Sequence, residues 1–137
     1  MPSSVDSGRD AGMLFDTDIL IWIFRGNARA ANLIDGQDDR RLSVISYMEL
    51  IQGAHDKREM KTIKGFLFDL GFQLIPLNEN IGHRAAIYME EYGLNAGMRM
   101  ADALIAATAV EGGLVLCTGD RKHYKTINDL DLKYFRP

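Results

Sequence analysis

The chain has 137 residues, 47% of them hydrophobic and 26% charged, a composition that indicates one globular domain and excludes disorder as its main state. Its formal net charge is −3 and its pI is about 5.6, so contact with nucleic acid requires local basic patches rather than a generally basic surface. The single cysteine, Cys117, has no partner for an intramolecular disulfide, which is typical of a reducing compartment, and we expect a cytoplasmic protein.

Residues 1–12 are polar and mixed in charge, and they lack the apolar run of a secretory signal. We expect them to form a disordered N-terminal extension that precedes a single domain over residues 13–137. This domain has no stretch of roughly 20 apolar residues, so no association with a membrane is expected.

Short apolar strands alternate with helices along residues 13–137. A strand over 13–16 leads into a helix from about 19 to 25, with Asp18 as its expected N-cap. The other expected elements are a helix over 28–34, a strand over 41–45, a helix opened by Ser46, a helix over 56–70, a strand over 72–76, a helix from Asn78 to about 92, a helix from about 98 that ends at Gly112, a strand over 114–117 and an edge strand over 132–135. This alternation predicts an α/β fold, a three-layer sandwich with a largely parallel central sheet.

Asp16 is an acid at the end of the apolar run 13–15 and just before the apolar segment 19–24. A buried carboxylate without a partner takes up a proton, so this position predicts a compensating partner. Three further acids, Glu49, Asp102 and Asp120, stand in segments that otherwise resemble packed structure. Ligands of parallel α/β sheets bind at the carboxyl ends of the strands, where Asp16 and Asp120 fall, so we interpret these acids as functional.

Some of these acids also have a purely structural explanation. Glu49 completes the capping-box pattern Ser46-x-x-Glu49, and Asp120 is placed to be a turn residue or the N-cap of a short helix. Asp102 is harder to explain in this way, because it lies among small and apolar neighbours near the start of its helix. Thr118 is placed to bond either a carboxylate or a metal-bound water.

A cluster of these four carboxylates would need a divalent cation. Two carboxylates about 4 Å apart repel by roughly 4 kcal/mol at an effective dielectric constant of 20. Oxygen ligands without His or Cys favour Mg²⁺ or Mn²⁺ over Zn²⁺. An acid-held Mg²⁺ suits phosphoryl transfer, because it activates water and neutralises charge on the phosphate.

Four stretches of the chain resemble the PIN-domain ribonucleases, and most closely the VapC-type toxins of type II toxin–antitoxin pairs. They occur in family order between residues 14 and 124, and they read LFDTDILIWIFRG, SVISYMELIQGA, MADALIAATAV and LVLCTGDRKHY. The family pattern places its four acids at Asp16, Glu49, Asp102 and Asp120. Asp18 and Asp120 stand where many relatives carry Asn.

The resemblance implies a PIN-like nuclease domain over residues 13–137 with the activity of an Mg²⁺- or Mn²⁺-dependent endoribonuclease. The four acids would hold the metal and help to activate water. The resemblance also implies a homodimer and a VapB-type antitoxin that blocks the site.

Basic residues near the acids are candidates for binding RNA phosphates, namely Arg99, Arg121 and Lys122. The segment 19–24 is apolar all round, and we expect part of it to meet a second subunit or an antitoxin helix.

Two other functions also fit parts of the sequence. Asp16 and Asp18 form a D-x-D pair after a strand, as in haloacid-dehalogenase-like phosphatases. Alternatively, the acids would serve only to bind Mg²⁺ in a non-catalytic regulatory module.

Overall fold

The structure is a computed structural model that describes residues 12–137 of the chain. The disorder expected for residues 1–12 therefore concerns residues that, apart from Gly12, lie outside the described part. The strands are β1 (Met13–Phe15), β2 (Arg40–Ser43), β3 (Gln73–Ile75), β4 (Val115–Thr118) and β5 (Leu132–Tyr134). The helices are α2 (Thr17–Phe24), α3 (Ala28–Asp35), α4 (Val44–Gln52), α5 (Lys57–Asp69), α6 (Glu79–Tyr92), α7 (Met100–Glu111) and α8 (Arg121–Tyr124).

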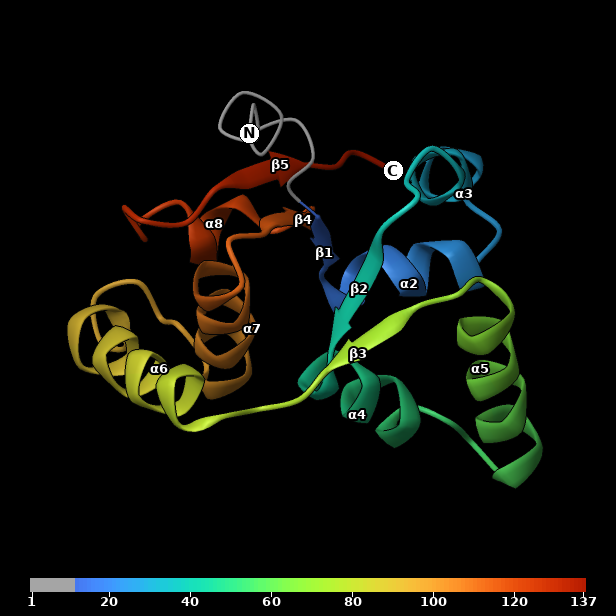
Figure 1. The fold of residues 1–137 in the computed structure, drawn as a ribbon, viewed down its shortest axis with the longest axis horizontal. Helices are drawn as coiled ribbons and strands as arrows, with labels where there is room; N and C mark the ends of the chain where they lie inside the picture. The colour runs from blue at the N-terminus through green and yellow to red at the C-terminus, as the bar shows by residue number, and fades with distance from the viewer. Residues whose placement is uncertain (1–11) are drawn as a thin grey trace, which may run out of the picture.

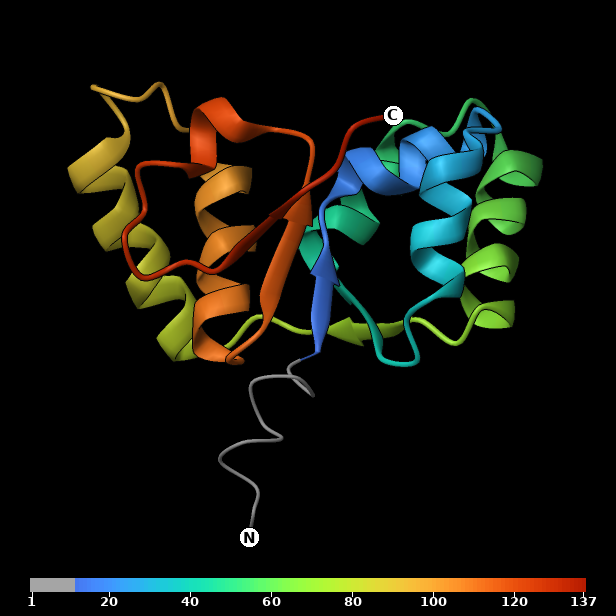
Figure 2. The same cartoon turned by 90° about the horizontal axis from the view of Figure 1, so that it is seen from above.

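The strands form one sheet in the order β3-β2-β1-β4-β5, and every neighbouring pair is parallel. Helices cover both of its faces (Figures 1 and 2). The predicted three-layer α/β sandwich is therefore confirmed, and so is the position of β5 at an edge of the sheet.

Alternating side chains of the central strands divide the core into two apolar clusters. Leu14 of β1 and Leu116 of β4 face the cluster formed with α6 and α7, whereas Phe15 and Cys117 face the cluster formed with α2, α3 and α5. Because successive residues of a strand point to opposite faces, a strand buried on both faces needs apolar residues throughout. The apolar runs in the sequence are thus explained by burial on two sides.

The strand order reverses between β1 and β4, because the chain first moves from β1 to β2 and β3, then returns to the other side of β1. In open parallel sheets such a switch point forms a crevice at the carboxyl ends of the two strands. Asp16 follows β1 and Asp120 follows β4, so both lie at this crevice. In Figure 2 it lies along the upper edge of the molecule, where α2 and α8 begin.

Two expected helix starts are wrong. Asp16 caps α2 in place of Asp18, and its side chain accepts from the Thr17 N–H. Ser43 caps α4 in place of Ser46, and its hydroxyl accepts from the Ile45 N–H. In both cases the strand ends earlier than predicted, at Phe15 and Ser43, so the following helix begins earlier too.

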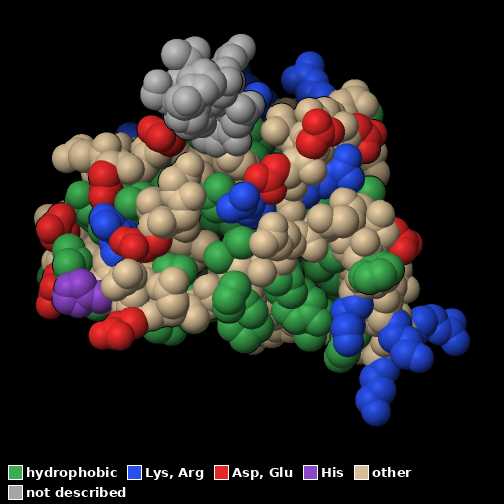
Figure 3. All heavy atoms as spheres, viewed as in Figure 1, with side chains coloured by type: hydrophobic (Ala, Val, Ile, Leu, Met, Phe, Trp, Pro, Cys, Tyr) green, Lys and Arg blue, Asp and Glu red, His purple; other side chains and the backbone are tan. Residues whose placement is uncertain are grey.

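The surface drawn in Figure 3 is the face opposite the crevice, and it has basic and apolar regions. Lys and Arg side chains extend from α5 at its lower right, where Lys57, Arg58, Lys61 and Lys64 are exposed. Hydrophobic side chains gather at its lower centre, over β3 and the residues that follow it. Among residues 12–137, no helix has both the length and the apolar character needed to cross a bilayer.

Candidate active site

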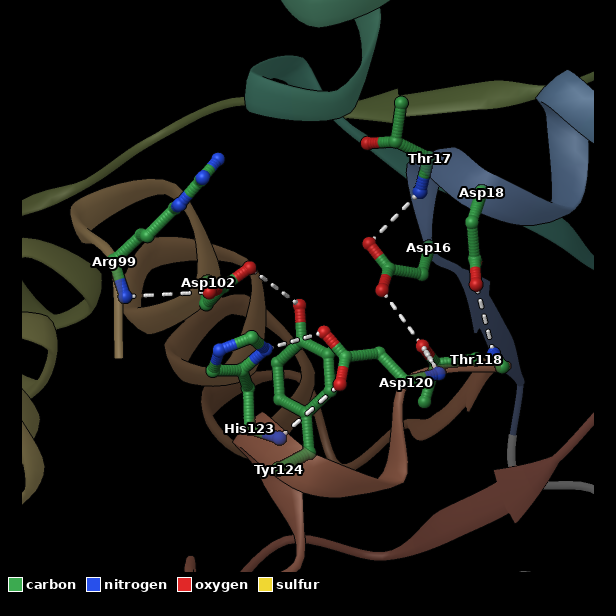
Figure 4. Close-up of polar contacts among 10 residues, drawn as sticks. Asp16, Thr17, Asp18, Arg99, Asp102, Thr118, Asp120, His123 and Tyr124 are labelled. Atoms are coloured by element: carbon green, nitrogen blue, oxygen red, sulfur yellow. Dashed lines mark hydrogen bonds and ion pairs between the residues drawn. The ribbon is translucent and has the colours of Figure 1, made fainter. Parts of the chain in front are cut away.

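Asp16 is fixed from two sides at the start of α2 (Figure 4). Its Oδ1 accepts from the Thr17 N–H at 2.8 Å, and its Oδ2 accepts from the Thr118 hydroxyl at 2.7 Å. The residue is only 8% exposed. The carboxylate therefore has a fixed orientation at the switch point between β1 and β4.

Burial is the main cause that raises the pKa of Asp16 from 3.8 to about 7. The charges of Asp18 and Asp102 raise it further, while the hydrogen bonds from Thr118 and Thr17 lower it. Both carboxylate oxygens already accept a hydrogen bond, yet the raised pKa still favours the protonated, neutral form of Asp16. A nearby cation would restore its charge.

Asp18 also belongs to the site, although the preferred interpretation of the sequence made it a helix cap. Its Oδ2 accepts from the Gly119 N–H at 2.9 Å, and its Oδ1 is buried and has no partner among the described residues. Burial, followed by the charge of Asp120, raises the pKa of Asp18. A Cβ at Gly119 would lie 2.9 Å from Asp18 Oδ2, so glycine there permits the close approach.

Asp102 lies in the first turn of α7 and faces Asp16 across the site. Its Oδ2 accepts from the Arg99 N–H at 3.2 Å, and its Oδ1 accepts from the Tyr124 hydroxyl at 3.4 Å. The first turn of a helix favours an anion, because unpaired N–H groups point toward it. The small side chains Ala103, Ala106 and Ala107 are buried and let α7 pack closely on its neighbours.

Asp120 caps α8 and is engaged by His123. Its Oδ1 accepts from the His123 N–H at 3.1 Å, and its Oδ2 lies 2.7 Å from Nδ1 of the His123 ring. The structural alternative foreseen for this acid, a helix N-cap, is thus present. A cation-binding role for Asp120 would add to this capping role.

Glu49 stands at the margin of the group. The capping box with Ser46 is absent, because α4 begins at Val44; instead Glu49 Oε1 accepts from the Thr17 hydroxyl at 2.6 Å. Thr17 follows Asp16 directly, so this bond joins α4 to the start of α2. We call Asp16, Asp18, Asp102 and Asp120 the acid site and treat Glu49 as its neighbour.

The chemistry of the acid site fits a divalent cation held by oxygen ligands. The raised pKa of Asp16 and the unpartnered Asp18 Oδ1 are both features that bound positive charge would compensate. Within residues 12–137, no three Asp, Glu, His or Cys side chains are already arranged around one point suited to an ion. Asp120 and Glu49 are turned toward His123 and Thr17, so they would have to rotate to join Asp16 and Asp102.

The basic residues expected to bind RNA lie close to the acid site in the sequence and are exposed. Arg99 is the N-cap residue of α7, next to Asp102. The Arg121 guanidinium stacks on the Tyr134 ring of β5, 4.5 Å from its centre. Lys122 is free of this stack and lines a groove of about 440 Å³ together with Lys125 and Tyr92.

The PIN domain family model matches residues 13–128 of the chain. A comparison with curated proteins found no match.

Several solved structures have the same fold as this chain. A chain of a toxin–antitoxin complex from Klebsiella pneumoniae is 28% identical with a TM-score of 0.73, covering 87% of this chain and 95% of that one. A VapBC complex from Rickettsia felis, bound to a DNA fragment from its promoter, is 21% identical with a TM-score of 0.76, covering 90% and 98%. FitAcB from Neisseria gonorrhoeae is 24% identical with a TM-score of 0.70, covering 88% and 95%.

Proposed function

The chain belongs to the PIN-domain family, and from that premise we propose that it is an Mg²⁺- or Mn²⁺-dependent endoribonuclease, the toxin of a toxin–antitoxin pair. The observation that carries this proposal is the buried Asp16 carboxylate, which faces Asp102 at the switch point of the sheet. A carboxylate that only caps a helix does not explain why two further acids, Asp18 and Asp102, lie near it. A carboxylate that binds a divalent cation does, because such a cation takes several oxygen ligands.

In this proposal Asp16 and Asp102 hold the metal, and Glu49 and Asp120 complete the set when it binds. The metal would supply activation of water and neutralisation of charge on the phosphate. The chain itself orients the carboxylates: Thr118 and the Thr17 N–H hold Asp16, while the Arg99 N–H donates to Asp102. Attack of water on phosphorus with departure of the 3′ oxygen would leave a 5′-phosphate and a 3′-hydroxyl.

Arg99, Arg121 and Lys122 are proposed to bind the RNA backbone beside the acids. A chain of net charge −3 has no general attraction for RNA, so these exposed cations would supply the local one. Arg121 also brings the Tyr134 ring, which is 38% exposed, to the same place. An exposed aromatic ring beside a phosphate contact is suited to stacking on an RNA base.

A groove between α2, α4 and α5 is proposed to receive an apolar segment of a VapB-type antitoxin. It measures about 410 Å³, and its lining includes the apolar side chains Ile21, Phe24, Leu50 and Ile63 together with the charged Arg25, Glu49 and Glu59. Ile21 and Phe24 are 37% and 42% exposed, whereas Ile19 and Leu20 of the same helix are buried in the core. Because Glu49 also bonds Thr17, a segment in this groove would lie next to the acid site.

A second copy of the chain is proposed to cover the apolar surface around β3. Leu74 and Leu77 are 40% and 42% exposed there, and Phe68 at the end of α5 is 83% exposed. Together with Tyr47 and Phe72, Phe68 and Leu74 line a groove of about 460 Å³. Contiguous exposed apolar side chains of this kind mark interaction surfaces.

We place the protein in the cytoplasm, where RNA is abundant and thiols stay reduced. Cys117 fits this location: it is a free, buried thiol, and burial raises its pKa to about 12, so it is unreactive. Its role is that of a small core residue.

Membership of the PIN family argues against the alternative that the chain is a haloacid-dehalogenase-like phosphatase. It requires Asp18 as a proton donor to the leaving group, yet Asp18 Oδ2 accepts from the Gly119 N–H and Oδ1 is buried. The other alternative is a regulatory module that binds Mg²⁺ without hydrolysing RNA, and the experiment below distinguishes it from a nuclease.

The test is incubation of the purified protein with mixed cellular RNA in Mg²⁺, in Mn²⁺ and in chelator. We expect cleavage with either metal, none in chelator, and 5′-phosphate ends on the products. Metal binding by calorimetry without cleavage of any RNA would favour the regulatory module. Cleavage that is unaffected by chelator would overturn the metal-dependent mechanism.

A further inference from the structure

Tyr124 carries a hydroxyl at a buried position that a phenylalanine ring would fill equally well. It is 0% exposed and belongs to the apolar cluster between the sheet, α6 and α7. Burying a hydroxyl in such a cluster costs free energy unless the hydroxyl has a partner. The position of its hydroxyl therefore needs a specific explanation.

The hydroxyl of Tyr124 lies at the side of the acid site that faces the core. It donates to Asp102 Oδ1 at 3.4 Å, and Figure 4 shows it between Asp102 and Asp16. The charges of Asp16, Asp102 and Asp120 all act on it. No other residue that the structure describes reaches these acids from inside the core with a hydroxyl on an aromatic ring.

Burial and three surrounding acids oppose loss of the phenolic proton. The hydroxyl is thus a neutral donor, and Asp102 Oδ1 accepts its hydrogen bond. Thr118 plays the matching part for Asp16, to which it donates at 2.7 Å. Two facing carboxylates are each held by one hydroxyl from the protein interior.

We propose that Tyr124 is a positioning residue of the acid site, whose hydroxyl fixes the Asp102 carboxylate opposite Asp16 in the orientation that binds a divalent cation. This inference rests on the proposed function only in taking the acid site to be a metal site. Hydrogen-bond partners of metal-binding side chains typically contribute about 10–100-fold to metal affinity. The rigid ring, packed against the core, is well suited to this task.

The test compares Tyr124→Phe with Tyr88→Phe by titration with Mn²⁺. Tyr88 is a matched control, because it is also buried in the same cluster and its hydroxyl donates to an acid, Asp129, at 2.9 Å. None of the four acids of the acid site acts on Tyr88 among the leading causes of its raised pKa. Both variants lose one buried hydroxyl, but only one of them lies beside the acid site.

We expect Mn²⁺ to bind Tyr124→Phe about 10-fold or more weakly than the wild type, and Tyr88→Phe with unchanged affinity. Equal affinity of Tyr124→Phe and wild type would overturn the inference, and so would tighter binding, which would mean that the hydroxyl competes with the cation. If the wild type binds Mn²⁺ but cleaves no RNA, the proposed function fails while the affinity ratio still decides the role of Tyr124. If the wild type binds no Mn²⁺, both are wrong.

A second measurement needs no substitution at Tyr124. The wild-type protein is labelled with ¹³C at the ζ carbons of its five tyrosines, and the signals are assigned through Tyr→Phe variants at the other four positions. Saturation with Mg²⁺ should shift the Tyr124 signal and leave the Tyr88 signal in place. A Tyr124 signal that stays unmoved at saturating Mg²⁺ would contradict a contact between its hydroxyl and the ligands.

Discussion

Thr118 donates a hydrogen bond of 2.7 Å to Asp16, although the two residues are 102 positions apart in the chain. Thr118 is the last residue of β4, and Asp16 directly follows β1, so the bond closes the switch point of the sheet at its carboxyl edge. The same hydroxyl accepts from the Asp120 N–H at 3.0 Å. One buried threonine thus links two acids of the acid site.

Replacing Thr118 with valine keeps the shape and removes both bonds. We expect a loss of roughly 1–3 kcal/mol in unfolding free energy, because a buried carboxylate oxygen and the Asp120 N–H lose their partner. Thr108→Val is the control: Thr108 is also buried, and its hydroxyl donates to the Leu104 carbonyl within α7. Chemical denaturation measures both variants, and an equal or larger loss in Thr108→Val would contradict the special role of Thr118.

The raised pKa of Asp16 predicts a pH-dependent stability of the metal-free protein. The unfolded chain releases this proton near pH 3.8 and the native protein only near pH 7. The native state binds more protons between these values, so the stability contributed by Asp16 is fully present below about pH 4 and is lost as the pH rises through about 7. The shift corresponds to roughly 4 kcal/mol.

Denaturation in chelator at about pH 5 and about pH 8 measures this effect as the difference between the wild type and Asp16→Asn. Asparagine carries no titrating proton, so the variant should gain stability relative to the wild type at the higher pH. Added Mg²⁺ should reduce that gain. A difference that does not change with pH would show that Asp16 titrates as it does in the unfolded chain.

The basic residues beside the acids should affect RNA binding more than the chemical step. We expect Arg99→Ala and Lys122→Ala each to raise KM for RNA and to leave kcat within about twofold. Each should also reduce the slope of log affinity against log salt concentration by about 1, because one phosphate contact is lost. Lys64→Ala is the control, since Lys64 is an exposed cation on α5 that lines the groove with Phe68 and does not belong to the basic residues beside the acids. Steady-state kinetics at two salt concentrations gives both quantities, and an equal effect of Lys64→Ala would refute a local binding patch.

The groove between α2, α4 and α5 predicts a variant that separates toxin activity from inhibition. Phe24→Asp places a charge among Ile21, Leu50 and Ile63, so it should weaken antitoxin binding at least about 10-fold while RNA cleavage persists. Phe68→Asp adds the same charge outside this groove, on the separate apolar surface around β3, and it should spare antitoxin binding. Calorimetry with the proposed VapB-type antitoxin measures both, and retention of wild-type affinity by Phe24→Asp would exclude the groove.

The sequence predicted the elements well because their burial patterns are local. The apolar residues of β1 and β4 and the alanines of α7 show their burial by residue type alone. The predicted starts of α2 and α4 are wrong because each segment offers more than one capping residue, Asp16, Thr17 and Asp18 before α2 and Ser43 and Ser46 near α4. The choice between them depends on where strand pairing ends, and that depends on residues far along the chain.

The sequence singled out three acids of the acid site, Asp16, Asp102 and Asp120, but it predicted Asp18 as a helix cap and did not predict the contacts among them. The pairing of Asp18 with Gly119, of Glu49 with Thr17 and of Tyr124 with Asp102 joins segments that are distant in sequence. One feature of the sequence points to Tyr124 as a neighbour of the acids: it follows Asp120 by one helical turn, in a segment otherwise rich in charged residues. Its burial depends on the packing of α8 against α7.

A role of Asp16 in metal-dependent RNA hydrolysis is tested by comparing Asp16→Asn with Asp56→Asn in a single RNA-cleavage assay with Mn²⁺. Both residues are N-caps that accept a backbone N–H at 2.8 Å, and asparagine caps a helix as well as aspartate does. Asp16→Asn should lose at least about 100-fold in cleavage rate, or roughly 3 kcal/mol of transition-state stabilisation, while Asp56→Asn keeps its activity. Cleavage by Asp16→Asn at the rate of Asp56→Asn would exclude this role of Asp16.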